Sequence, residues 1–172
     1  MANNVNQELF PIVNEQGEVI GRATRAECHS GSMLLHPVVH LHIFDSKGRL
    51  YLQRRSMNKD IQPGKWDTAV GGHIDYGESV DEALRREVRE ELGITQFTPI
   101  HNFTYHFRSS VERELVYSYR TIYEGEIKID PVEIDEGRYW DIDDIIEQLG
   151  QGVFTPNFEQ EFQRLLTVIH AH

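Results

Sequence analysis

Residues 72–94 read Gly-His-Ile-Asp-Tyr-Gly-Glu-Ser-Val-Asp-Glu-Ala-Leu-Arg-Arg-Glu-Val-Arg-Glu-Glu-Leu-Gly-Ile, and this stretch decides the fold. Ser79 and Glu82 have the spacing of a capping box, which predicts that a helix begins there. Gly93 is a typical C-terminal stop. We therefore expect one helix between Ser79 and Gly93.

One side of this helix is apolar and the adjacent side is strongly acidic, at about 100° per residue. The apolar stripe consists of Val80, Leu84, Val88 and Leu92. Glu87, Glu90 and Glu91 crowd beside it, and like charges at these spacings repel by roughly 0.2–0.5 kcal/mol per pair. Bound Mg²⁺ would turn this repulsion into attraction, because hard cations take oxygen ligands and share substrate phosphates.

Two further side chains are expected to support the acidic cluster. Arg86 lies one turn before Glu90 and can hold its carboxylate, and Glu78 can reach toward the same region from before the helix. An ordinary solvated, glutamate-rich helix is the alternative interpretation. However, nine specified residues at fixed spacing have a chance expectation on the order of 10⁻⁷ per chain, given average residue usage. The full pattern therefore favours a metal site.

Residues 72–94 resemble the complete Nudix box, the defining motif of the Nudix hydrolase superfamily, with no departure at any fixed position. The resemblance implies an α/β fold, an α/β/α sandwich around a mixed β-sheet. It also implies that the box binds Mg²⁺ or Mn²⁺ and cleaves a diphosphate linkage. By the same resemblance, the backbone carbonyl of Gly72 completes a metal site whose ligands or general base are Glu87, Glu90 and Glu91.

The composition fits a single domain over residues 1–172. A formal charge of −11 argues against non-specific binding of nucleic acid or anionic membranes. Small phosphorylated substrates are compatible with it, because metal ions locally invert the field. Cys28 is the only cysteine, and the polar start Met-Ala-Asn-Asn-Val-Asn lacks the features of a signal peptide. We expect a cytoplasmic protein.

The rest of the chain alternates strand and helix signals, which is typical of an α/β arrangement. Strands are predicted at 10–13 and 19–22, which form an N-terminal hairpin, and at 37–44 and 49–55. A further strand follows a Pro63-Gly64 turn, and two long strands are predicted at 98–108 and 113–124. Helices are predicted after Thr24, at 142–149 and at 156–169, the last with Thr155 as its cap. A homodimer through the N-terminal hairpin is a further expectation.

A second group of side chains offers ligands of another kind, namely His29, His36, His73, Glu112 and Glu114. The two glutamates have the spacing that places both side chains on one strand face. Imidazole and carboxylate together suit a transition metal such as Zn²⁺ or Mn²⁺. Taken singly, each of these residues is more often structural or exposed, so the prediction rests on the joint pattern.

The joint pattern is similar to type I isopentenyl-diphosphate isomerases, which are Nudix relatives. In those enzymes two histidines seven residues apart, a histidine after a Cys-Gly pair and a Glu-x-Glu pair bind a catalytic metal. Two departures argue against an isomerase here. Gly71 stands where the isomerase has its catalytic cysteine, and the acidic box is intact where isomerases usually have a degraded one. The chain thus resembles a bacterial group of Nudix hydrolases with isomerase-like N-terminal regions.

The resemblance leaves several roles open. The general base is Glu87 in the box or Glu136 in a predicted loop, 135–137. Arg54, Arg55 and Lys59 are candidate diphosphate contacts, or solvated surface charges. Tyr105 and Phe154 are candidates to line an apolar pocket, or ordinary core residues.

The sequence is compatible with three functions. The first is a metal-dependent pyrophosphohydrolase acting on a nucleotide or a nucleoside diphosphate derivative. The second is an isopentenyl-diphosphate isomerase or a hydrolase of isoprenoid diphosphates, and the third is a nucleotide-sensing module without catalysis. His40 and His42 should share a strand face with His36, but a solvated or hydrogen-bonded face accounts for them equally well. We leave these two histidines out of the predicted site.

Overall fold

The computed structural model describes residues 8–59 and 61–170, and the structural statements below concern these residues. The N-terminal stretch on which the signal-peptide expectation depends lies outside them. Within the described part, no helix is both long and apolar enough to cross a membrane.

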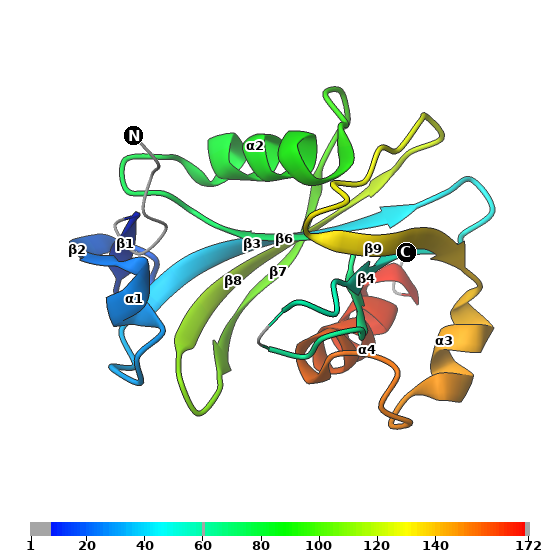
Figure 1. Ribbon diagram of the computed structural model, residues 1–172. Helices are drawn as coiled ribbons and strands as arrows, with labels where there is room; N and C mark the ends of the chain where they lie inside the picture. Colours follow the sequence, from blue (N-terminus) through cyan, green and yellow to red (C-terminus); the bar gives the residue numbers. More distant parts are fainter. Residues whose placement is uncertain (1–7, 60, 171–172) are drawn as a thin grey trace.

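A seven-stranded mixed sheet forms the middle layer of the molecule (Figure 1). The strand order is β5-β4-β3-β8-β7, while β6 pairs with β3 and β9 pairs with β4. Only β3 and β8 run parallel; the other pairs are antiparallel. The bounds of the strands are β3 Leu35–Phe44, β4 Leu50–Arg55, β5 Trp66–Thr68, β6 Val70–His73, β7 Ile100–Arg108, β8 Arg113–Ile122 and β9 Ile134–Trp140.

Helices cover both faces of this sheet, so the α/β/α prediction is confirmed. Helix α2, Val80–Leu92, covers one face, while α3, Ile142–Gln148, and α4, Pro156–His170, lie on the other side (Figure 1). The predicted N-terminal hairpin is also present. It consists of β1, Leu9–Val13, and β2, Val19–Thr24, and it leads into the short helix α1, Arg25–Cys28.

The alternation of side chains along β3 divides this strand between an apolar face and a polar face. Val39, Leu41 and Ile43 are buried in the core cluster beneath α2. The intervening residues lie on the opposite face, and among them are His36, His40 and His42, of which the last two contact Glu161 of α4. The predicted common face of these three histidines is therefore confirmed.

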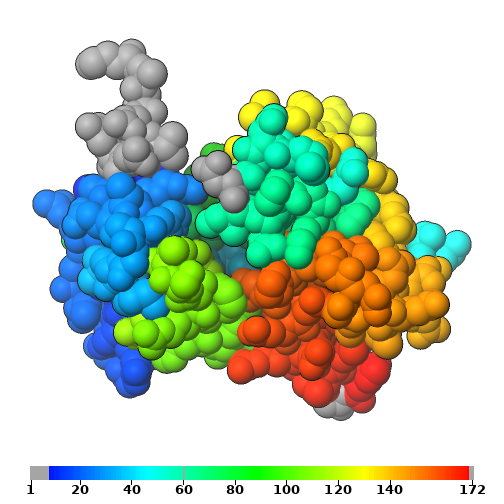
Figure 2. Space-filling view, turned by 60° about the horizontal axis from the view of Figure 1, so that its bottom comes forward, coloured from blue at the N-terminus to red at the C-terminus, as the bar shows by residue number. Residues whose placement is uncertain are grey.

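The sheet divides near the box. β3 and β4 pair directly only at Ile43 with Tyr51 and at Phe44 with Leu50. Beyond these pairs, β6 lies against β3 and β5 lies against β4, so the two halves of the sheet diverge. Figure 2 shows a hollow on the face of the molecule where α4 lies. The hollow is bordered by the β7–β8 hairpin, by the segment after β4 and by α4.

Most predicted elements are confirmed with shifts of one or two residues at their ends. Ser79 and Glu82 form the predicted capping box, and Gly93 ends α2 in the left-handed conformation at φ 68°. Thr155 also caps α4 as predicted, since its hydroxyl accepts from the Phe158 amide. One prediction was wrong: residues 135–137 are part of strand β9, paired with β4, and not a loop.

Replacing Ser79 by Ala should destabilise the protein by about 1 kcal/mol, because the first turn of α2 loses its side-chain acceptor. Urea unfolding would measure the change in the free energy of unfolding. The matched control is Ser110→Ala, at an exposed position outside every helix. Equal stability of the two variants would contradict the importance of this cap.

Candidate active site

The acidic face of α2 lies against the backbone of β6. Gly72 allows this contact, because a Cβ at that position would overlap the carboxyl group of Glu87. The apolar side of α2 holds it there, since Leu84, Val88 and Leu92 are buried in the core beneath the helix. The predicted apolar stripe is thus confirmed, and it brings the Glu87 carboxylate next to the β6 main chain.

Arg86 connects the box carboxylates to one another. Its guanidinium donates to both oxygens of Glu78, at 2.7 and 2.9 Å, and to Glu87 Oε1 at 2.8 Å. It also donates to the carbonyl of His73 at 3.0 Å. The predicted contact with Glu90 is the longest of the set, at 3.4 Å, and the Glu90 side chain is 56% exposed. Arg86 therefore positions mainly Glu78 and Glu87.

Glu87 and Glu91 are carboxylates held away from water. Burial, more than the neighbouring charges, raises the pKa of Glu87. Burial and then the charge of Glu87 raise the pKa of Glu91 to about 8. Gln53 lies 3.5 Å from Glu91 Oε1, while Glu91 Oε2 is buried with no hydrogen-bond partner among the described residues.

This arrangement fits a divalent cation. Two partly buried acids repel each other, and the unpartnered oxygen of Glu91 is an available hard ligand. Glu87, Glu91 and the more exposed Glu90 would hold the ion. The Gly72 carbonyl lies on the same strand segment that Glu87 contacts.

The second predicted group also comes together. Ligand atoms of His29, His36, His73 and Glu112 all lie within 4.8 Å of one another. Glu114 Oε2 is 4.0 Å from Nε2 of both His36 and His73. Five residues from four parts of the chain therefore meet at one point, which supports the joint pattern read from the sequence. Glu112 itself lies just before β8 and not within the strand.

Neighbouring groups orient the imidazoles toward this point. His36 Nδ1 lies 3.0 Å from the carbonyl of Leu34 and donates to it, which leaves the lone pair of Nε2 facing the cluster. Phe10 of β1 stacks on His73 with ring centroids 4.5 Å apart. The Nε2 atoms of all three histidines are buried without an aligned hydrogen-bond partner among the described residues, as is Glu112 Oε2. A set of nitrogen and oxygen ligand atoms without aligned hydrogen-bond partners fits a transition metal.

The two groups lie on opposite faces of the sheet. Gly72 faces α2, so the adjacent Gly71 and His73 face the other way. His36 and Glu114, which are paired neighbours on β3 and β8, share that second face. Burial and the nearby Glu112 raise the pKa of Glu114 to about 7.

The three predicted cationic contacts each have a carboxylate partner. Arg54 lies 3.5 Å from Glu136, Arg55 lies 3.5 Å from Asp67, and Lys59 pairs with Glu133. Glu136 faces Arg54 across the β4–β9 pair, with its side chain 48% exposed. None of the described contacts joins Glu136 to the carboxylates of α2, so Glu87 is the better placed of the two candidate bases.

Tyr105 and Phe154 do not form an apolar pocket. Phe154 is buried in the core beside Trp140 and Phe158. The Tyr105 hydroxyl donates to Glu161 and lies 3.0 Å from Asn157 Oδ1, so this residue belongs to a polar network.

Glu161 was missed in the sequence. It is buried, with 1% of its surface exposed, and both imidazoles of His40 and His42 contact its carboxylate. A signal was present, because Glu161 falls on the apolar face of α4 between Phe158 and Leu165. A charged residue on such a face needs partners in the core.

Comparisons with known proteins identify the family of this chain. The model of the NUDIX domain matches residues 34–158. An uncharacterised Nudix hydrolase of Yersinia pestis is 33% identical over 129 residues, which cover 75% of this chain and 70% of that protein. An isopentenyl-diphosphate Δ-isomerase of Enterobacter sp. is 30% identical over 149 residues, covering 83% and 81%. The chain spans about half the length of two other isomerases that it matches.

The fold has a similar match among solved structures. The crystal structure of DR0079 from Deinococcus radiodurans superimposes with a TM-score of 0.79 at 25% identity, covering 91% of this chain and 98% of that one. Both kinds of relative predicted from the sequence, hydrolase and isomerase, are thus found. The family match includes every fixed residue of the acidic box, and the chain belongs to the Nudix hydrolase family.

Proposed function

We propose that this protein is a divalent-metal-dependent pyrophosphohydrolase that cleaves a diphosphate linkage in a nucleotide or a nucleoside diphosphate derivative. The observation that carries the proposal is a pair of partly buried acids, Glu87 against β6 and Glu91 with a buried, unpartnered carboxylate oxygen. A site of this kind suits Mg²⁺ or Mn²⁺. The cation would neutralise phosphate oxygens and make a bound water more acidic.

The residues of the chain supply the remaining steps. Glu87 would take the proton of the attacking water, and partial burial raises its pKa above that of an ordinary glutamate, which makes it a stronger base. Arg86 holds Glu87 through a 2.8 Å hydrogen bond, so the base is oriented before substrate arrives. Arg54, Arg55 and Lys59 would reach the diphosphate by exchanging their present carboxylate partners for phosphate oxygens. A cytoplasmic location and a homodimer stay predictions from the sequence.

A second candidate substrate is an isoprenoid diphosphate. The assembled His/Glu cluster favours it, because this cluster resembles the metal site of the isomerases. Isomerisation itself would need a proton donor at the allylic carbon, and Gly71 has no side chain to provide one. Assays with isoprenoid diphosphates should therefore release phosphate or pyrophosphate. Interconversion of the two five-carbon diphosphates would support an isomerase instead.

Replacing Glu87 by Gln should lower kcat by about 10²-fold or more, because the amide cannot accept the proton of water. The measurement is phosphate and pyrophosphate release with Mg²⁺ or Mn²⁺ over nucleotides, nucleotide sugars, dinucleotides and isoprenoid diphosphates. Glu147→Gln, at an exposed position on α3, is the matched control. Wild-type turnover in folded Glu87→Gln would refute the proposed base. Tight nucleotide binding without turnover by the unmodified protein would indicate a sensing module.

In metal-free buffer, the free energy of unfolding should contain a contribution from Glu91 that decreases as pH rises from about 4.5 to about 8. The folded state binds this proton more tightly than the unfolded state. The contribution is therefore complete at pH values below the pKa of Glu91 in the unfolded state, and it is lost as the pH rises through the pKa in the folded state. Measuring the free energy of unfolding against pH for the unmodified protein and for Glu91→Gln isolates this contribution. Glu90→Gln is the control. Mg²⁺ should restore stability at pH 8. Parallel profiles for the unmodified protein and Glu91→Gln would contradict this prediction.

The His/Glu cluster should bind about one Zn²⁺ or Mn²⁺ per chain. His36→Asn and Glu112→Gln should weaken this affinity by at least about tenfold, because each removes an oriented ligand. Metal content after dialysis, measured by mass spectrometry, tests the prediction. His101→Asn, at an exposed site on β7, should retain the metal. Equal metal content in all of these variants would exclude the cluster as the site.

A further inference from the structure

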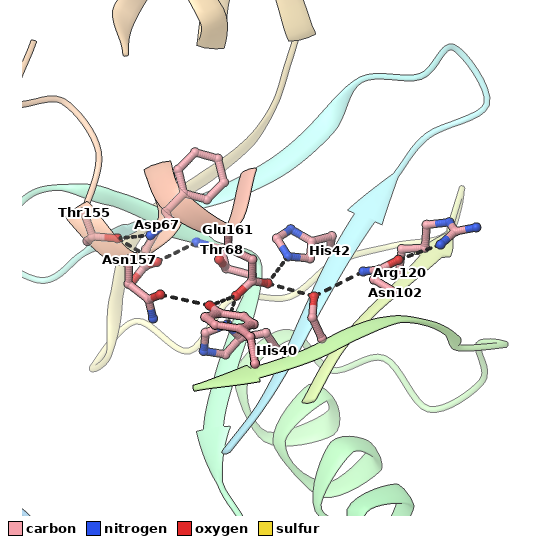
Figure 3. A network of polar contacts seen from close by, with 12 residues as sticks. His40, His42, Asp67, Thr68, Asn102, Arg120, Thr155, Asn157 and Glu161 are labelled. Carbon is pink, nitrogen blue, oxygen red and sulfur yellow. Dashed lines mark hydrogen bonds and ion pairs between the residues drawn. The ribbon is translucent and has the colours of Figure 1, made fainter. Parts of the chain in front are cut away.

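The buried carboxylate of Glu161 on α4 has partners on three strands (Figure 3). Glu161 Oε1 lies 2.6 Å from His40 Nδ1, and Oε2 accepts from Ser118 at 2.8 Å. His42 Nε2 and the Tyr105 hydroxyl also donate to this carboxylate. Helix α4 is therefore connected through one side chain to β3, β7 and β8.

The buried charge of Glu161 favours an imidazolium beside it, because a neighbouring cation offsets the cost of removing an anion from water. The two imidazoles differ in their surroundings. The His42 ring is fully buried, and its Nδ1 has no hydrogen-bond partner among the described residues.

His40 is the better carrier of the positive charge. Its Nδ1 donates to Glu161, while its side chain retains 12% exposure to solvent. Burial lowers the pKa of His40, but the charge and hydrogen bond of Glu161 outweigh it and raise the pKa to about 9. The exposed edge of the His40 ring lets its second N–H bind water or a ligand. The core that encloses His42 does not allow this.

The free edge of His40 lies beside Gly71. A Cβ on Gly71 would be 3.3 Å from His40 Cδ2 and 3.6 Å from Nε2, so the absence of a side chain keeps this edge uncovered. His40 Nε2 makes no hydrogen bond to any of the residues described. Gly71 directly precedes Gly72 and His73, which each belong to one of the two candidate metal sites.

Other charged groups near His40 already have partners. Glu114 of β8 lies 4.0 Å from His36 and His73, and Asp67 of β5 pairs with Arg55 at 3.5 Å. On α4, the guanidinium of Arg164 lies over the Tyr105 ring, 4.8 Å from its centroid. The N–H of His40 is thus left for a ligand, which must be an acceptor and is best an anion.

We propose that His40 is a substrate-binding residue, whose Nε2–H donates to a phosphate oxygen of the substrate, and that Glu161 is the positioning residue that holds it. The proposal deepens the proposed function, on which it depends for taking a diphosphate as the ligand. It extends substrate contact from the acidic helix to the opposite face of the sheet. No bond forms or breaks at His40, so its contribution is to binding and not to the chemical step.

The test uses the full chain with Mg²⁺ and inorganic pyrophosphate as the probe, measured by calorimetry at pH 7.5. His40→Gln should weaken pyrophosphate binding by about tenfold or more, because a charged hydrogen bond is lost. For the hydrolysed substrate, KM should rise while kcat changes little. His101→Gln is the matched control and should bind as the unmodified protein does. Unchanged affinity in folded His40→Gln would overturn the proposal.

Nitrogen-15 NMR of the imidazoles gives a second readout that does not require a variant to fold. In the unmodified protein, His40 should show both ring nitrogens protonated, and its Nε2 signal should shift when pyrophosphate is added. In Glu161→Gln, the Nε2 proton should be lost at the same pH and pyrophosphate affinity should fall. A neutral His40, or an Nε2 signal that pyrophosphate leaves unchanged, would overturn the assignment.

Failure of this proposal is distinguishable from failure of the proposed function. If the protein releases no phosphate from any substrate yet binds pyrophosphate through His40, the hydrolase proposal fails and the His40 assignment stands. If Glu87→Gln loses turnover while His40→Gln retains both KM and pyrophosphate affinity, the hydrolase proposal stands and the role of His40 is refuted.

Discussion

The contact between the Glu87 carboxyl and the Cβ-free backbone of Gly72 is the constraint on which the rest of the site depends. It sets how closely α2 can approach β6. Once Gly72 faces the helix, strand geometry requires Gly71 and His73 to face the opposite side of the sheet. The hydrogen bond from Arg86 to the His73 carbonyl then connects the acidic helix to the strand segment that carries the His/Glu cluster. The two candidate metal sites therefore meet at two consecutive residues, Gly72 and His73.

The sequence predicts well those features that depend on local signals. The ends of α2 follow from Ser79, Glu82 and Gly93, since each of these residues satisfies or ends the helix backbone by itself. Strand β9 could not be found in this way. Residues 134–140 include aspartate, glutamate and glycine, all of which are depleted in strands. This segment is a strand because β4 offers it an edge, and that depends on the tertiary fold.

The candidate site was also predicted only in part. The box carboxylates and the His/Glu cluster were found because each matches a fixed spacing. Glu161 matches no motif, and its histidine partners are about 120 positions earlier in the chain. Two weak signals, the polar alternation at His40 and His42 and a glutamate on the apolar face of α4, needed the structure to bring them together. Each signal alone is compatible with ordinary surface chemistry.

The family match covers residues 34–158, whereas Phe10, His29 and Glu161 all lie outside it. Phe10 stacks on His73, His29 completes the cluster, and Glu161 holds His40. The acidic box thus lies wholly within the matched domain, whereas the opposite face of the sheet also takes side chains from both flanks. A truncation to residues 34–158 would therefore keep the acidic box and remove Phe10, His29 and Glu161 together.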